Sequence, residues 1–128
     1  MLSATQFAAR LPGAGTPAVE VSDAVILRNC ATGLTATPSG NQASGILIAA
    51  LINEFTVIGS DGDAATLPPA VAGVVIMIAN ATAKSLNLYP AVGEKINGTQ
   101  DSAFAVAAGK SILLFATATG SWRAVVSA

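Results

Sequence analysis

The sequence contains no histidine and only one cysteine in 128 residues. Histidine is the side chain that most often serves as a general base near neutral pH and as a metal ligand. Its absence excludes a Ser-His-Asp or Cys-His catalytic arrangement. Because the single cysteine, Cys30, has no partner within the chain, folding does not depend on a disulfide. We interpret Cys30 as a small buried hydrophobic residue.

Charged and aromatic residues are also scarce, at 10% and 5% of the chain. A typical soluble domain is about a quarter charged. A folded monomer of this mass exposes about 6,200 Å², which six basic and seven acidic residues cover thinly. We therefore expect much of the surface to be buried against copies of the chain or against a partner. The alternative is a soluble monomer that uses Ser, Thr and Asn in place of charge.

The net charge is −1 and no basic run occurs, which argues against nucleic acid as a partner. The N-terminus lacks the basic-then-apolar order of a signal peptide. No apolar stretch reaches the ~18 residues that a membrane span needs. The expected partners therefore include neither nucleic acid nor membrane.

The first third of the chain differs from the rest. Ser3 can cap a short helix over residues 4–10, and two Pro and two Gly then break it at residues 11–17. Residues 22–30 fit a helix and a strand equally well. We predict that residues 1–40 form an arm and linker, ending in a loop, that packs on the body or on a neighbour; the alternative is a frayed terminus.

The clearest pattern is the apolar run at residues 74–79, in which two Val and two Ile suit a strand covered on both faces. Gly73 and the β-branched residues count against a helix. Residues 80–85 carry turn chemistry, and residues 85–89 alternate with a period of two. We predict that the two runs form a hairpin at the centre of a small β domain.

The rest of the chain predicts more strands. Two apolar runs separated by Asn53 and Glu54 suggest two strands or one strand with a bulge. Pro68 and Pro69 mark the edge position that leads into the central strand. Strands are predicted at 46–52, 55–58, 104–108, 111–116 and 122–126. Their spacing predicts an all-β, antiparallel β-sandwich or jelly-roll-like barrel over residues 41–128, without a repeat of 20 to 50 residues.

No constellation of residues predicts chemistry, and we expect no enzyme, catalytic residue, cofactor or metal. The carboxylates are scattered at Glu20, Asp23, Glu54, Asp61, Asp63, Glu94 and Asp101, and turn chemistry predicts that most are solvated. Asp61-Gly62-Asp63 starts like a calcium loop but lacks the later ligands. Gly109-Lys110-Ser111 lacks the first glycine of a phosphate-binding loop.

Trp122 and Tyr89 are the large amphipathic aromatic residues. An exposed ring of this kind stacks on sugars in carbohydrate-binding modules. The alternative is that each ring closes an end of the β body with its polar atom at the rim. Because Gly120 and Ser121 place Trp122 at the start of a strand, we favour the second interpretation.

Residues 42–128 carry an ordered set of motifs: TLPPAVAG, VVIMIAN, LNLYPAVGEKING, AAGKS and a Trp after a Gly-Ser turn. This set resembles a family of small bacteriophage virion proteins, which are β-rich head decoration (cement) proteins and modules of tail fibres. The resemblance implies no catalytic residues. It is less clear over the N-terminal third.

The resemblance and the low charge together predict a homotrimeric capsid decoration protein. It would be made in the host cytoplasm and would bind on the virion surface over junctions of the major capsid protein. The alternative is a tail-fibre or spike module that binds a receptor or carbohydrate. The residues expected to contact a subunit or the capsid are Phe7, Leu11, Pro12, Pro68, Pro69 and Trp122.

Overall fold

The computed structural model describes residues 29–128, and this part of the chain is all-β, as the sequence predicts. Its strands are β1 (Cys30–Thr35), β2 (Ile46–Leu47), β3 (Ile52–Val57), β4 (Asp63–Thr66), β5 (Val75–Asn80), β6 (Leu86–Tyr89), β7 (Lys95–Ile96), β8 (Thr99–Gln100), β9 (Phe104–Val106), β10 (Ser111–Ala118) and β11 (Ser121–Val126). No helix long and apolar enough to cross a membrane occurs in residues 29–128. The helix predicted over 4–10 lies outside the described residues, as do most of the undecided segment 22–30 and the predicted contacts Phe7, Leu11 and Pro12.

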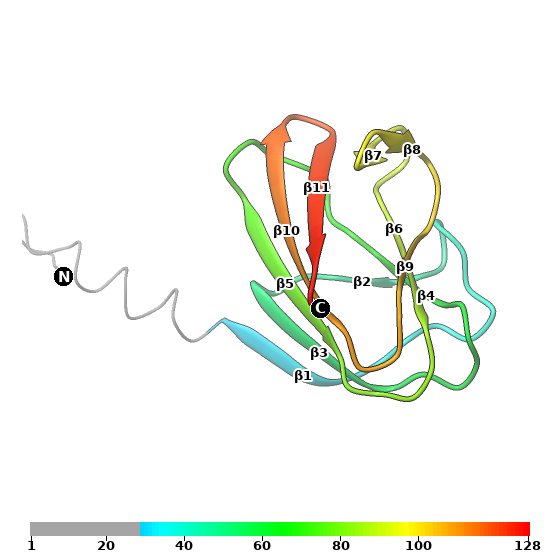
Figure 1. The fold of residues 1–128 in the computed structure, drawn as a ribbon. Coiled ribbons are helices and arrows are strands. Elements are labelled where there is room, and N and C mark those ends of the chain that lie inside the picture. The colour runs from blue at the N-terminus through cyan, green and yellow to red at the C-terminus, as the bar shows by residue number, and fades with distance from the viewer. Residues whose placement is uncertain (1–28) are drawn as a thin grey trace, which may run out of the picture.

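The strands form two sheets that enclose one core (Figure 1). The larger sheet has seven strands in the order β1-β3-β5-β10-β11-β7-β8. The smaller sheet has four strands in the order β2-β4-β6-β9. Buried side chains of both sheets meet between them, among them Phe55, Leu114 and Trp122 from the larger sheet and Leu86 and Leu88 from the smaller.

From β1 to β6 the chain alternates between the two sheets, so that each strand pairs with the strand two places before it. These pairs are parallel: β1 with β3, β3 with β5, β2 with β4, and β4 with β6. The winding resembles a β-solenoid more than a sandwich or a jelly roll. The predicted antiparallel architecture is therefore wrong for this half of the chain. The antiparallel pairs are β6 with β9, β5 with β10, β10 with β11 and β7 with β8.

The winding also gives the chain a structural repeat that its sequence does not reveal. Cys30 pairs with Ile52, which in turn pairs with Met77, so successive turns advance by 22 and 25 residues. The sequence itself has no convincing period in this range. The turns share strand positions without sharing residue identities, and their lengths differ, so a search for repeated letters finds no period.

The predicted central hairpin does not form, because the two runs lie in different sheets. β5 pairs with β3 and β10, whereas β6 pairs with β4 and β9. Asn80 holds the corner between them. Its Nδ2 donates to the carbonyl oxygens of Lys84 at 2.7 Å, Val106 at 3.1 Å and Ala107 at 3.2 Å. Its Oδ1 accepts from the backbone N–H and the Oγ1 of Thr82. This buried amide satisfies backbone groups that a hairpin would have paired directly.

The body begins earlier than the predicted boundary at residue 40. β1 lies in the larger sheet, and Thr37 forms an isolated bridge with Ala64. The loop predicted at the end of the segment 1–40 is therefore partly a strand that packs on the body. A second omission is the β7–β8 hairpin, whose turn residues Asn97 and Gly98 both have positive φ, at 50° and 84°. Asn-Gly is the usual pair for this two-residue turn.

We predict that Asn80→Ala lowers the free energy of unfolding by about 3 kcal/mol, because it removes a buried amide that donates to three carbonyl oxygens, one of these hydrogen bonds being fully buried. Urea denaturation followed by tryptophan fluorescence measures the change. Asn87→Ala, at a half-buried position of β6 outside this network, is the matched control and is expected to cost less. Equal stabilities of the two variants would contradict the role given to Asn80.

Candidate functional site

The outer face of the larger sheet carries a continuous row of apolar side chains across five strands. The row consists of directly paired residues: Cys30 with Ile52, Ile52 with Met77, Met77 with Leu113, and Leu113 with Val125. Directly paired side chains point to the same side of a sheet. Ile52 is 41% exposed, Met77 46% and Val125 56%. We call this row and the rows beside it the apolar face.

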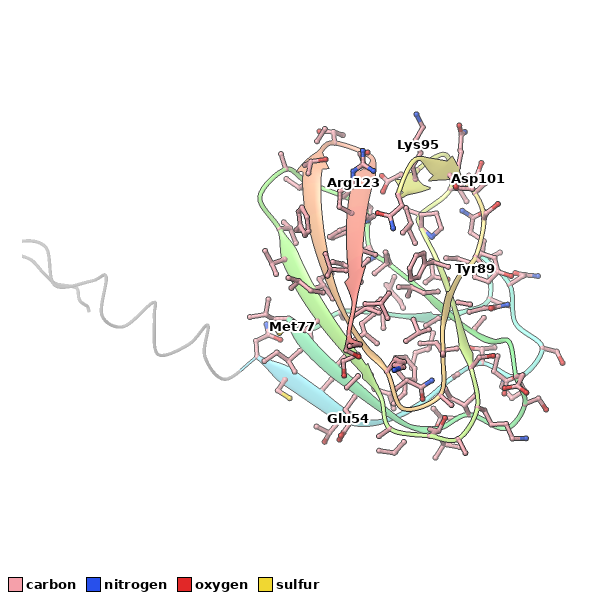
Figure 2. All side chains as sticks on the ribbon, viewed as in Figure 1. Glu54, Met77, Tyr89, Lys95, Asp101 and Arg123 are labelled. Atoms are coloured by element: carbon pink, nitrogen blue, oxygen red, sulfur yellow. The ribbon has the colours of Figure 1, made fainter. Side chains whose placement is uncertain are left out.

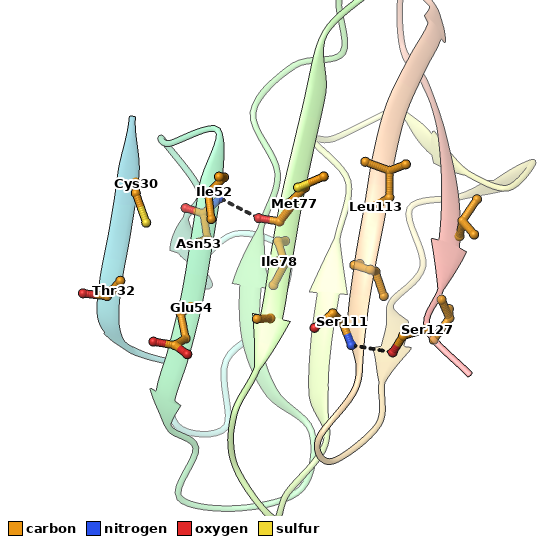
Figure 3. A pocket seen from close by; sticks show the side chains of 14 residues that line it. Cys30, Thr32, Ile52, Asn53, Glu54, Met77, Ile78, Ser111, Leu113 and Ser127 are labelled. Carbon is orange, nitrogen blue, oxygen red and sulfur yellow. Dashed lines mark hydrogen bonds between the residues drawn. The ribbon is translucent and has the colours of Figure 1, made fainter. Parts of the chain in front are cut away.

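The apolar face forms an open groove of about 590 Å³ (Figure 3). On one side of the central row, Glu54, Ala79 and Ser111 are paired in register. This row ends at Ser111, whose backbone N–H donates a hydrogen bond to the Oγ of Ser127 at 2.9 Å. Val75 and Phe115 lie on the other side of the central row. The groove therefore offers apolar contact with a few small polar groups.

Strand β5 explains why this face is unusual for a single chain. Its inner side chains Ile76 and Ile78 are buried in the core, while Val75 and Met77 on the outer side are exposed. Parallel strands are normally covered on both faces, and β5 is parallel to β3. The sequence predicts two covered faces for this strand, and the described residues cover one of them.

A second apolar groove adjoins the first along β5. It has a volume of about 370 Å³ and is lined by residues 47–51, Pro68 and residues 74–76. Leu47, on the edge strand β2, is 62% exposed. We call this the end groove. Val75, which lines the end groove, and Met77, which lines the apolar face, are both exposed on the outer side of β5, so the two surfaces meet along this strand.

Two charged side chains stand at opposite corners of the apolar face (Figure 2). Glu54, half-buried on β3, pairs with Ala79, two residues after Met77 on β5. It therefore lies in the row next to that of Met77. Arg123, exposed on β11, pairs with Phe115, which in turn pairs with Val75, two residues before Met77. It therefore lies in the row on the opposite side of the Met77 row. Lys95 on β7 pairs with Ser121 and adds a second positive charge near the Arg123 corner. The face is thus apolar in the middle, acidic at one corner and basic at the opposite one.

The structure corrects two assignments made from the sequence. Trp122 is fully buried in the core, so the predicted contact with a subunit or capsid is wrong for this residue. Its Nε1 has no hydrogen-bond partner among the described residues, so the polar atom is not at a rim either. Cys30 is exposed at the edge strand and is not a buried hydrophobic residue. Pro68 is half-buried in the end groove and Pro69 is exposed beside it; their contact role stays a prediction.

The carboxylates near β4 and β8 hold loops of the fold in place through hydrogen bonds. The buried Asp63 accepts the backbone N–H groups of Ser39, Gly59 and Ser60 at 3.0 to 3.1 Å. These hydrogen bonds, that of Ser39 foremost, lower the pKa of Asp63. In Asp61-Gly62-Asp63, Asp61 also accepts a backbone N–H, from Ser85. Within residues 29–128, no group of three or more metal-ligating side chains converges.

A similar arrangement holds the loop between β6 and β9. Asp101 accepts the side-chain amide of Gln42 at 3.0 Å and the backbone N–H of Gly93 at 2.6 Å. The hydrogen bond from Gln42, followed by that from Gly93, lowers the pKa of Asp101. Gln42 also donates to the carbonyl oxygen of Pro90. This carboxylate therefore joins distant loops.

Sequence reasoning missed the members of the apolar face as a group. The run at residues 74–79 signals that Met77 needs cover on its own side of the sheet. Ile52 and Val125 carry no such local signal, because only the pairing of distant strands brings them beside Met77.

No protein-family model, curated protein or solved structure matches the chain. The resemblance to small phage virion proteins therefore stays a prediction from the motifs. What the site does has to be inferred from its own geometry.

We predict that Asp63→Asn lowers stability more at pH 7 than at pH 3, because the amide offers one acceptor oxygen to three N–H donors. The pKa of Asp63 is lower in the folded chain than in the unfolded chain. The stability that the ionised carboxylate of Asp63 contributes is thus fully present above about pH 4, and it is lost as the pH falls through the folded-state pKa.

Urea midpoints at the two pH values measure the difference for Asp63→Asn. Asp61→Asn is the control, because its remaining oxygen still accepts the single N–H of Ser85. An equal loss at pH 3 and pH 7 for Asp63→Asn would contradict a contribution from the ionised carboxylate.

Proposed function

We propose that this chain is a non-enzymatic structural protein of a phage virion, a decoration (cement) protein that binds over junctions of the major capsid protein and stabilises the head. It would be made in the host cytoplasm and act on the capsid surface as a homotrimer. The two sheets would serve as a stiff, sandwich-like body that carries apolar surfaces to its neighbours.

The observation that carries the proposal is the continuous apolar surface formed by the apolar face and the end groove. Exposed apolar surface of this extent on a body with few charges is typical of an interaction site. Burying such surface contributes about 25 cal/mol per Å². Repeated over many copies, contacts of this kind would bind a shell together against internal pressure.

The two surfaces suit different contacts. The end groove lies beside Pro68 and Pro69, which the sequence marks as contact residues, and it includes the edge strand β2. Edge strands and apolar grooves accept segments of neighbouring proteins. We assign the end groove to the capsid and the apolar face to a contact between two copies of this chain. The homotrimer itself would need a different contact, because one face that meets itself joins only two copies.

The alternative, a tail-fibre or spike module that binds a receptor or carbohydrate, has less support. A sugar-binding module needs an exposed aromatic ring, and Trp122 is buried. Tyr89 is half-buried on β6. Neither groove includes Tyr89 among its lining residues.

Particles that lack the protein provide the test. Wild-type chain mixed with such particles is expected to sediment with them, and Leu47→Asp is expected to remain in the supernatant. The substitution places a charge in the apolar end groove at a residue that is 62% exposed, so the fold should change little.

Val92→Asp is the matched control, since Val92 is 79% exposed and lines neither groove. It is expected to sediment like the wild type. If the wild-type chain does not bind the particles, the decoration role is wrong. If Leu47→Asp binds as well as Val92→Asp, the end groove is not the contact.

A further inference from the structure

The positions of Glu54 and Arg123 prevent them from pairing within one copy. They lie on β3 and β11, which are separated by β5 and β10. In register they stand on opposite sides of the Met77 row. Strand spacing and the rise per residue place them about 20 Å apart. Neither side chain spans that distance, so within residues 29–128 the two do not pair with each other.

The apolar row between the two corners needs cover that the described part of the chain does not provide. A partner for it must be apolar in the middle, basic where it meets Glu54 and acidic where it meets Arg123. The apolar face itself has these properties. If two copies meet by this face around a two-fold axis that opposes their corners, Glu54 of each copy lies against Arg123 of the other, and the apolar middles of the two faces cover each other.

We propose that the apolar face is a two-fold contact between two copies of this chain, with Glu54 of each copy paired to Arg123 of the other and the apolar side chains around Met77 and Leu113 covered between them. The inference deepens the proposed function and rests on it in taking self-association as part of that function. Because the contact concerns copies of the chain alone, it can be tested in solution without any particle. Failure of capsid binding and failure of self-association are therefore separate results.

The experiment is a charge exchange in the full chain. Wild type, Glu54→Arg, Arg123→Glu and the double variant are compared by sedimentation equilibrium over a wide concentration range. The wild type is expected to associate through this two-fold contact and to show a mass of at least a dimer. Each single variant sets like charges against each other in every contact, and its dissociation constant is expected to rise about tenfold or more. The double variant restores opposite charges and should return close to the wild-type value.

Lys84→Glu is the control for Arg123→Glu. It makes the same change in net charge at an exposed residue of the corner between β5 and β6, which does not line the apolar face. It is expected to leave the dissociation constant unchanged. The double variant has the net charge of the wild type, so its recovery also controls for Glu54→Arg.

Cys30 provides a second readout, because its exposed thiol lies at the edge of the apolar row. Alkylation of Cys30 is expected to slow over the concentration range in which the mass rises. A wild-type chain that stays monomeric overturns the proposal. A protected Cys30 in that monomer would show that the chain covers its own face, and a reactive Cys30 would leave the face to a different protein. Single variants that associate like the wild type, or a double variant that does not recover, also overturn it.

Discussion

Strand β5 is apolar on both of its faces, and the rest of the structure follows from how each face is covered. Ile76 and Ile78 point inward and meet the smaller sheet across the core. Val75 and Met77 point outward, where the described part of the chain supplies no cover. The neighbours β3 and β10 repeat this pattern in register, with Phe55 and Leu114 inside and Ile52 and Leu113 outside. The apolar outer side of β5 is therefore extended by its neighbours into one apolar face of the sheet.

The winding of the chain makes that face contiguous. Because the chain crosses from one sheet to the other after each strand, β1, β3 and β5 stack side by side although many residues separate them. In a meander of hairpins the neighbours of β5 would be strands close in sequence. The corners that the winding requires expose backbone groups, and buried side chains such as Asn80 and Asp63 satisfy them. These polar residues direct the path of the chain as much as the apolar residues build its core.

Local patterns predicted individual strands better than their partners. The apolar runs that became β5, β10 and β11 were recognised within a residue or two, because each carries its own period and bounding turn. Asn53 and Glu54 predict either a gap between two strands or a bulge in one strand, whereas Asn53 is buried within β3, where its Nδ2 donates to the carbonyl oxygens of Ala50 and Met77. Parallel pairing was not predicted, since its contacts join distant segments and leave no mark at short range. The same limit hid the apolar face, whose members meet only through that pairing.

Because the chain carries few charges, Glu54 and Arg123 at the two corners of the apolar face can determine how two faces align, which apolar burial cannot do. Apolar contact is non-directional, so an apolar surface such as that around Ile52, Met77 and Leu113 covers another apolar surface in several orientations at similar cost. Opposite charges at opposite corners favour one of these registers and penalise those that bring like charges together. With Glu54 and Arg123 about 20 Å apart across the row, a small slip separates both pairs at once. The apolar residues would thus provide the strength of the contact, and the two charges its alignment.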